Sequence, residues 1–260
     1  MQSNVKYFLS ACYLFILSTS YSQTMTTSTN YIQISQQLLY AVRTGDSSEN
    51  FILQLSAADK NELRKQLQTD AEKKAFWLNI YNAFIQKLLS AHPEKYKSRN
   101  SFFTNKQIEI AGIALSPDDI EHGILRRSKV KWSLGYFNKL FPSRFEKDFR
   151  VSVLDNRIHF ALNCGAKSCP PIAYYAPANI DKQLEVATKN YLHTESDYDT
   201  ASGVIYLPKI MSWFRADFGG KKGMKKMLEK YGITKKGEDF TIRFKEYDWT
   251  LFLDNYRQEN

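Results

Sequence analysis

The sequence contains little cysteine, little histidine and only one long apolar run. Its 260 residues include three cysteines and four histidines, and their spacing matches no common zinc pattern, so we predict no metal. It has no phosphate-binding loop, nucleotide-binding motif or calcium loop, and we expect no cofactor. It also lacks internal repeats and long linkers rich in Pro, Gly or Ser. These absences favour a single domain.

The one long apolar run lies near the N-terminus. It extends from Tyr7 to about Leu17, follows a positively charged start and precedes several small residues. This pattern is typical of a secretory signal peptide, here cleaved after Ser22, and the run is too short to span a bilayer. The sequence therefore predicts an exported protein, periplasmic or extracellular, with a signal peptide over residues 1–22 and a flexible leader over 23–30.

A lipoprotein signal is the alternative for this segment. Leu9-Ser10-Ala11-Cys12 has the form of a lipoprotein box, which would place a lipid on Cys12. The apolar stretch before the box is short and the run continues beyond it, so we favour the cleaved signal peptide. After that cleavage, Cys164 and Cys169 are the only cysteines left.

The chain is basic and rich enough in apolar residues to build a core. Hydrophobic residues make up 43% of it and aromatic residues 14%, and its formal net charge is +9. Much of the excess charge lies in Lys221–Lys236. We interpret these lysines first as a solvated helix face and second as a contact for an anionic surface, such as lipid head groups or acidic polymers. Export and the lack of a binding motif argue against nucleic acid, and nothing indicates an oligomeric state.

Hydrophobic spacing predicts six helices. The strongest signal covers Asp70–Ala91, which is apolar nearly all round and is therefore expected to be a central, buried helix. The other helices are expected over Tyr31–Arg43, from Ser56 as N-cap, from Ser116 as N-cap, over Ile180–His193 and over Gly220–Tyr231.

Alternating patterns predict short strands between these helices. Ile108 to Leu115 suggests a hairpin, and strands are expected at Val204–Leu207 and Phe240–Phe244. A second hairpin is predicted from Val151–Leu154 and Arg157–Leu162. The fold class is therefore α+β, with one domain over residues 31–260. We expect a helical N-terminal half whose central buried helix packs on a small, mainly antiparallel sheet.

The segment from His159 to Pro171 carries most of the candidate chemistry. Cys164 is one candidate nucleophile and Cys169 a second, since a nearby histidine can activate a thiol. The two cysteines can instead form a disulfide, which an exported protein permits. A zinc site that includes His122 is the least favoured alternative. The residues leave the first two interpretations open.

The predicted strand bears on which histidine would act as the base. Five residues along a strand place His159 and Cys164 on opposite faces, unless the chain bends between them. His159 would be the base, or His122 if the fold brings the Glu121 helix over the loop, with Glu121 orienting the imidazole. The objection favours His122 more than the sequence proximity of His159 suggests. The thiol interpretation fails if neither cysteine lies within hydrogen-bond reach of a histidine.

Several separated motifs together resemble the DUF547 family of domains of unknown function. The resemblance covers about residues 71–251 and rests on Ala75–Ala83, Ile120–Arg126, Asp155–Pro171 and Tyr247–Trp249. It implies functional positions, without an assigned activity or ligand, at Asn79, Tyr81, Asn82, Glu121, His122, His159, Asn163, Cys164, Ser168, Cys169 and Pro170.

Two of these positions lie in the predicted buried helix. Asn79 and Asn82 are three residues apart and share one face, and a buried amide without partners costs about 1–3 kcal/mol. We expect them to bond to the cysteine loop or to the Glu121 helix, either as a structural network or as support for a catalytic centre. A central helix beside a histidine-bearing sheet is also similar to papain-like and transglutaminase-like enzymes, by analogy only.

The leading hypothesis is an exported thiol-dependent hydrolase or acyltransferase that acts on peptide or amide bonds. Asn79 or Asn163 would then stabilise an oxyanion. The residues expected to bind substrate or support the site are Tyr81, Asn82, Asn163, Ser168 and Arg126. The alternative is a non-enzymatic envelope protein with a Cys164–Cys169 disulfide and a basic face for a partner or a membrane surface.

Overall fold

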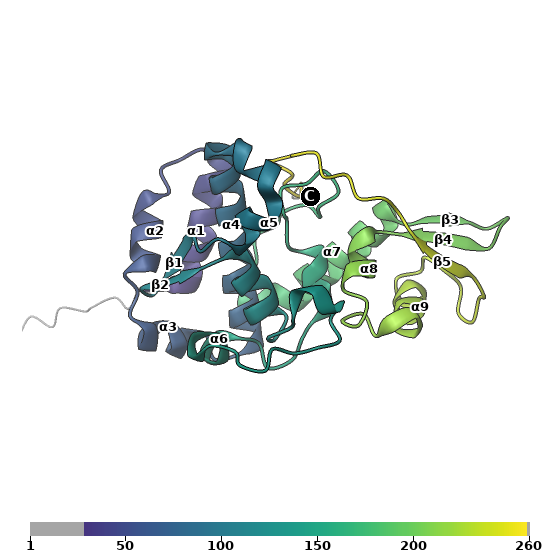
Figure 1. Cartoon of the computed structure of the whole chain (residues 1–260), viewed down its shortest axis with the longest axis horizontal. Helices are drawn as coiled ribbons and strands as arrows, with labels where there is room; N and C mark the ends of the chain where they lie inside the picture. The colour runs from purple at the N-terminus through teal and green to yellow at the C-terminus, as the bar shows by residue number, and fades with distance from the viewer. Residues whose placement is uncertain (1–28, 259–260) are drawn as a thin grey trace, which may run out of the picture.

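The helix α4 (Asp70–Ala91) is the centre of the larger part of the molecule (Figure 1). The computed structural model describes residues 29–258. A capping box formed by Thr69 and Glu72 starts α4, and the chain turns at His92 before Pro93. From Lys73 to Gln86 every residue of α4 is buried, because neighbours cover it on all sides. Its predicted bounds and burial are confirmed.

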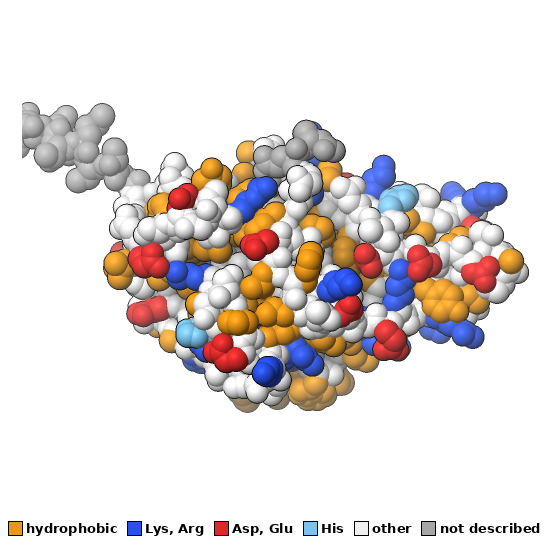
Figure 2. Space-filling model, turned by 90° about the horizontal axis from the view of Figure 1, so that it is seen from above, with side chains coloured by type: hydrophobic (Ala, Val, Ile, Leu, Met, Phe, Trp, Pro, Cys, Tyr) orange, Lys and Arg blue, Asp and Glu red, His pale blue; other side chains and the backbone are white. Residues whose placement is uncertain are grey.

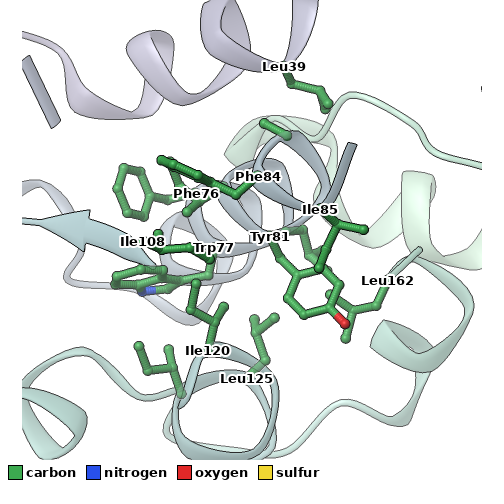
Figure 3. Packing of buried hydrophobic residues seen from close by; sticks show 14 of the residues in the cluster. Leu39, Phe76, Trp77, Tyr81, Phe84, Ile85, Ile108, Ile120, Leu125 and Leu162 are labelled. Carbon is green, nitrogen blue, oxygen red and sulfur yellow. The ribbon is translucent and has the colours of Figure 1, made fainter. Parts of the chain in front are cut away.

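Other helices and a hairpin surround α4. Figure 3 shows Ile120 and Leu125 packed beneath Trp77 and Tyr81. These two residues come from a π-helix over Asp119–Leu125. The remaining elements of this part are α1 (Tyr31–Thr44), α2 (Glu49–Ser56), α3 (Lys60–Gln66), α5 (Arg99–Thr104), α6 (Arg144–Phe149) and the antiparallel pair β1 (Ile108–Ile110) and β2 (Ile113–Leu115).

A three-stranded sheet lies in a second, smaller core at the other end of the molecule (Figure 1). Its strands are β3 (Asp197–Asp199), β4 (Val204–Leu207) and β5 (Thr241–Phe244), and its helices are α8 (Lys209–Trp213) and α9 (Gly220–Lys230). The pair β3–β4 is antiparallel and β4–β5 is parallel. The helix α7 (Ile180–Glu195) contributes side chains to both cores. The α+β class is confirmed, but α4 packs mainly among helices and not on this sheet.

Two local predictions are wrong. The segment expected as a hairpin over residues 151–162 contains a 3₁₀ helix, Asn156–Phe160, because the Asp155 carboxylate accepts from the backbone N–H and the Nε of Arg157 and fixes a turn. Ser56 ends α2 and does not cap a new helix. Instead Asp59 caps α3, accepting from two backbone amides of its first turn. In both places a short acidic side chain decided the local structure.

The chain after β5 runs back along the molecule towards α5 (Figure 1). Backbone hydrogen bonds join this segment to the cysteine loop, from Lys167 N to Thr250 O and from Phe252 N to Gly165 O. It thereby brings Tyr247 and Trp249, remote in sequence, beside that loop.

The predicted signal peptide, Cys12 and most of the predicted leader lie outside the described residues. Of the leader, Thr29 and Asn30 are described, and the Asn30 side chain caps α1. Between residues 29 and 258, no helix has the length and apolar character needed to cross a membrane.

Candidate functional site

A pocket of about 570 Å³ brings together six of the predicted functional positions, namely Tyr81, Glu121, His122, His159, Cys164 and Pro170. It opens between α4, the π-helix, the cysteine loop and the segment after β5. Its remaining lining is mostly aromatic or apolar, with Asn100, Phe103, Asp118, Lys131, Trp132, Leu134, Leu162, Ile210, Trp213, Phe214, Tyr247 and Trp249.

The π-helix supplies the carboxylate and one histidine of the pocket. Ser116 starts this helical segment as predicted, since its hydroxyl accepts from Asp119 N. Hydrogen bonds between residues five apart, the π-helical pattern, follow from Arg126 N to Glu121 O at 2.8 Å and from Ser128 N to Gly123 O at 2.7 Å. A π-helix is a rare element that occurs frequently at functional sites. Here its bulge places Glu121 and the next residue, a histidine, both on the pocket wall.

Glu121 is a nearly buried carboxyl group without a cationic partner. Its side chain is 15% exposed, and Tyr81 Oη lies 3.3 Å from its Oε2. Among the described residues, no lysine or arginine nitrogen lies within ion-pair distance of it. Burial raises the pKa of Glu121 to about 7, although the nearby charge of Arg126 opposes that rise. The carboxyl therefore exchanges its proton near neutral pH.

Asp118 is the second carboxyl group of the pocket and is held differently. The Lys131 ammonium lies 2.7 Å from its Oδ2. Burial raises the pKa of Asp118, while the hydrogen bond and charge of Lys131 oppose that rise. Of the two pocket carboxyl groups, only this one has a cation against it.

A chain of polar contacts connects the two histidines behind the pocket. Arg126 is fully buried and donates from Nη1 to His122 Nδ1 at 2.9 Å and from Nε to Asp217 Oδ2 at 2.7 Å. The same Asp217 oxygen lies 2.9 Å from His159 Nε2. Because a guanidinium only donates, His122 Nδ1 accepts, and its Nε2 carries the hydrogen, 3.5 Å from Asp118.

Both histidines are neutral at pH 7. Burial lowers the pKa of His122 well below its usual value, and the charge of Arg126 adds to this. Burial also lowers the pKa of His159 to about 4, against the hydrogen bond that His159 donates to Asp217. For Asp217 itself, burial acts to raise the pKa, but hydrogen bonds from His159 and Arg126 outweigh it and hold the pKa below the usual range. His159 thus donates from Nε2, and its buried Nδ1 has no hydrogen-bond partner.

Cys164 and Cys169 form a disulfide. The bond closes a short loop, which in chain-entropy terms contributes about 2 kcal/mol to stability. Tyr247 Oη lies 3.1 Å from each sulfur, and the other hydrogen bonds to sulfur come from backbone amides of the loop. Among the described residues, no histidine is hydrogen-bonded to either sulfur. In this state the pair is a cross-link that borders the pocket, and neither cysteine offers a thiol.

The buried amides of α4 lie behind the pocket and hold the cysteine loop. Asn79 is bonded both to the carbonyl and to the N–H of Tyr175, at 2.9 and 3.0 Å. Asn82 donates to Ala161 O and accepts from Asn163 N, both at 2.9 Å. Neither amide lines the pocket. The expected bond to the cysteine loop is present for Asn82, which serves here as support.

Two further predicted residues fix the chain around the loop. The Asn163 side chain donates to Pro170 O at 2.8 Å and accepts from Gly165 N at 2.9 Å, so it ties the two ends of the loop together. The Ser168 hydroxyl accepts from Asp248 N at 2.9 Å and holds the segment after β5. Both side chains therefore position backbone at the pocket edge.

Several residues of the site were not predicted from the sequence, either because no pattern marks them or because the pattern that contains them was not connected with a role. Asp217 joins the two histidines but stands in no recognisable pattern. Asp118 lies two residues after the predicted N-cap Ser116, and its sequence position suggests no role in a site. Tyr247 belongs to a quoted family motif, but no role was assigned to it. With Trp213 and Trp249 it forms an aromatic cluster whose ring centroids are 4.5 to 5.4 Å apart.

Comparison with known proteins gives a family and no function. Residues 64–192 match the family model described as "Protein of unknown function, DUF547". No curated protein and no solved structure matches the chain. The matched span includes α4, the π-helix and both linked cysteines, whereas Asp217, Tyr247 and Trp249 follow it.

The raised pKa of Glu121 makes stability depend on pH in a defined direction. The folded protein binds this proton more tightly than an unfolded chain with a pKa of 4.5. The contribution of the protonated group is therefore full below about pH 4.5 and is lost as the pH rises through about 7. We expect Glu121→Gln to be more stable than wild type at pH 8, by on the order of 2–3 kcal/mol, and equal to it at pH 4.

Urea unfolding of both proteins between pH 4 and pH 8 measures this difference. The exposed Glu109 on β1 provides the control, because Glu109→Gln should follow the wild type at every pH. If the free energies of unfolding of wild type and Glu121→Gln changed in parallel with pH, the raised pKa of Glu121 would be contradicted.

Proposed function

The chain belongs to the DUF547 family, whose function is unknown, and we propose that its pocket is the active site of a hydrolase acting on peptide or amide bonds, with Glu121 as the acid–base group. One observation carries the proposal. Glu121 lies on the wall of an open pocket as a nearly buried carboxyl group with a tyrosine hydroxyl beside it and no cation against it. A buried acid left unpaired in a cleft is a common mark of a catalytic group.

The proposed reaction needs only water and the side chains of the pocket. The Glu121 carboxylate removes a proton from a water molecule whose oxygen attacks the carbonyl carbon of the substrate. The resulting oxyanion collapses, the carbon–nitrogen bond breaks, and Glu121 returns the proton to the leaving amine. A pKa of about 7 suits both halves of this exchange.

Other pocket groups support an oxyanion and an apolar substrate side chain. The Lys131 ammonium and the Tyr247 hydroxyl both line the pocket and can donate to a developing negative charge. Tyr247 faces sulfur atoms, which are weak acceptors, so its hydrogen is available to a better one. The cluster of Trp213, Tyr247 and Trp249 offers a rigid wall for an apolar or aromatic group.

Turnover of a panel of aminoacyl and peptidyl anilides tests the proposal. We expect Glu121→Gln to lower kcat/KM at least about 100-fold, as loss of a general base does, and Glu109→Gln to leave it unchanged. Wild-type activity should rise with pH and level off above about pH 7, because the carboxylate is the active form. Full activity in Glu121→Gln, or no turnover of any member of the panel by wild type, would refute this assignment.

Thiol-dependent hydrolysis or acyl transfer is the second candidate, and it requires that reduction brings a histidine to the thiol, because among the described residues none is hydrogen-bonded to either sulfur. Cys164 lines the same pocket, so breaking the disulfide would expose a sulfur to the substrate, whereas Cys169 is buried. The same panel separates the two candidates. Activity that appears only after dithiothreitol, and that disappears in Cys164→Ser but not in Glu121→Gln, would favour the thiol.

We also propose that the protein is exported and cleaved after Ser22. The Cys164–Cys169 disulfide supports this, because such bonds persist mainly in oxidising compartments. N-terminal sequencing of the protein purified from the cell envelope or medium should begin at Gln23. A mature chain that begins with a lipid-modified Cys12, or an intact Met1 on cytoplasmic protein, would contradict it.

A further inference from the structure

The loop over residues 129–144, between the π-helix and α6, exposes an unusual set of large apolar side chains. The exposed fractions are 78% for Trp132, 58% for Tyr136, 61% for Phe137, 85% for Leu140 and 93% for Phe141. Single apolar residues are common on protein surfaces, but five large ones within ten residues are not. Such a group marks a surface that is covered by something else.

The loop is built to hold these side chains outward. Val130 N donates to Phe137 O at 3.0 Å, and Lys139 N donates to Ser128 O at 2.7 Å, which closes a hairpin-like turn. Inside the turn, the Ser133 hydroxyl donates to Val130 O and accepts from Phe137 N. These hydrogen bonds fix the turn, so the exposure of Tyr136 and Phe137 belongs to a hydrogen-bonded loop.

The loop is also fixed to the pocket. Ala216 N donates to Leu134 O at 2.9 Å. Gly135 has φ +87°, and a Cβ there would overlap the side chain of Asp217, so only glycine fits this close approach. Trp132 and Leu134 line the pocket themselves. The exposed set therefore begins at the pocket wall, where Trp132 and the hydrogen-bonded Leu134 lie.

The charged residues of the loop itself are all basic, although acids outside it pair with two of its lysines. Between Glu121 and Glu146 the sequence contains no acidic residue and six basic ones, Arg126, Arg127, Lys129, Lys131, Lys139 and Arg144. Arg127 and Arg144 are exposed, while Lys131 and Lys139 are paired with acids. Aromatic side chains mixed with exposed cations are typical of surfaces that enter the interface of a bilayer with anionic head groups.

We propose that the 129–144 loop is a membrane-binding surface that inserts its aromatic and aliphatic side chains among anionic lipid head groups. Bound in this way, the protein would hold its pocket beside the bilayer, because the loop forms one wall of that pocket. The proposal stands independently of hydrolase activity, since insertion uses none of the catalytic groups.

The lysines of α9 and the turn after it are the rival surface. From the sequence, our second interpretation of Lys221–Lys236 is a contact for an anionic surface. In α9 the apolar residues Met224 and Leu228 are buried and Met227 is partly buried against the second core, so this helix has no fully exposed apolar group to insert. Some of its lysines are neutralised, by Asp239 at 3.1 Å and by Glu185 at 2.8 Å. The face shown in Figure 2 likewise carries both basic and acidic side chains.

Co-sedimentation with vesicles tests the proposal. The vesicles contain phosphatidylcholine alone or with 30% phosphatidylglycerol, about a third of the lipid being anionic. The probe variant is Leu140→Ser/Phe141→Ser, which removes two almost fully exposed side chains without touching the core. The control is Tyr40→Ser/Leu53→Ser, which removes the same kinds of side chain from exposed sites on α1 and α2. All variants share one N-terminus, so any effect of the N-terminal apolar run is common to them.

We expect wild type to bind the anionic vesicles, the control to bind equally well, and the probe variant to bind at least tenfold more weakly. Glu121→Gln should bind as wild type does, which keeps this outcome separate from the fate of the hydrolase proposal. Equal binding by the probe variant, with loss in Lys221→Gln/Lys222→Gln/Lys226→Gln, would assign the contact to the α9 lysines. No vesicle binding by wild type, or a dimer that the probe variant dissociates without vesicle binding, would overturn the proposal.

Discussion

The hydrogen bonds of the buried amides of α4 are the interaction on which the rest of the site depends. Asn79, Asn82 and Gln86 lie three and four residues apart on one face of a helix that is otherwise packed with apolar side chains. Each amide, removed from water, must find partners, and an unpaired one would cost about 1–3 kcal/mol. Most partners are backbone groups of the 161–175 segment and of Asp254, and Gln86 also donates to the Asn163 side chain, so desolvation dictates where these loops lie.

The fixed loop then positions the chemistry around it. The Cys164–Cys169 disulfide and the side chain of Asn163 hold the loop closed, and the segment after β5 pairs with its backbone. That pairing delivers Tyr247 and Trp249 to one side of the pocket. The π-helix, packed on α4 from another direction, delivers Glu121 to the opposing wall. Residues from four separate parts of the chain thus meet around one carboxyl group.

The sequence predicted what depends on short-range pattern. The bounds of α4 and its burial follow from continuous apolar character, and the polar pair at Asn79 and Asn82 could be identified as needing partners. The hairpin around His159 was wrongly predicted, because alternating apolar residues do not reveal that the Asp155 side chain favours a tight turn. As a result, the distance argument that separated His159 from Cys164 assumed a strand that does not exist.

What escaped prediction depends on contacts between distant segments. Asp217 lies 58 residues beyond His159, and no local pattern connects the two. The state of the cysteines could not be decided from their spacing, which suits a thiol loop and a disulfide equally. The raised pKa of Glu121 likewise follows from the packing of α4 and the aromatic wall around it, and not from its neighbours in sequence.

Amide hydrogen exchange in Asn82→Ala is the most direct test of the claim that α4 amides hold the site. The account predicts that the N–H groups of Asn163 and Gly165 lose protection at least tenfold, while those of β4 in the second core keep theirs. The exposed Asn61→Ala on α3 serves as the matched control and should change neither. Unchanged protection in the cysteine loop, or an equal loss throughout the molecule, would contradict the account.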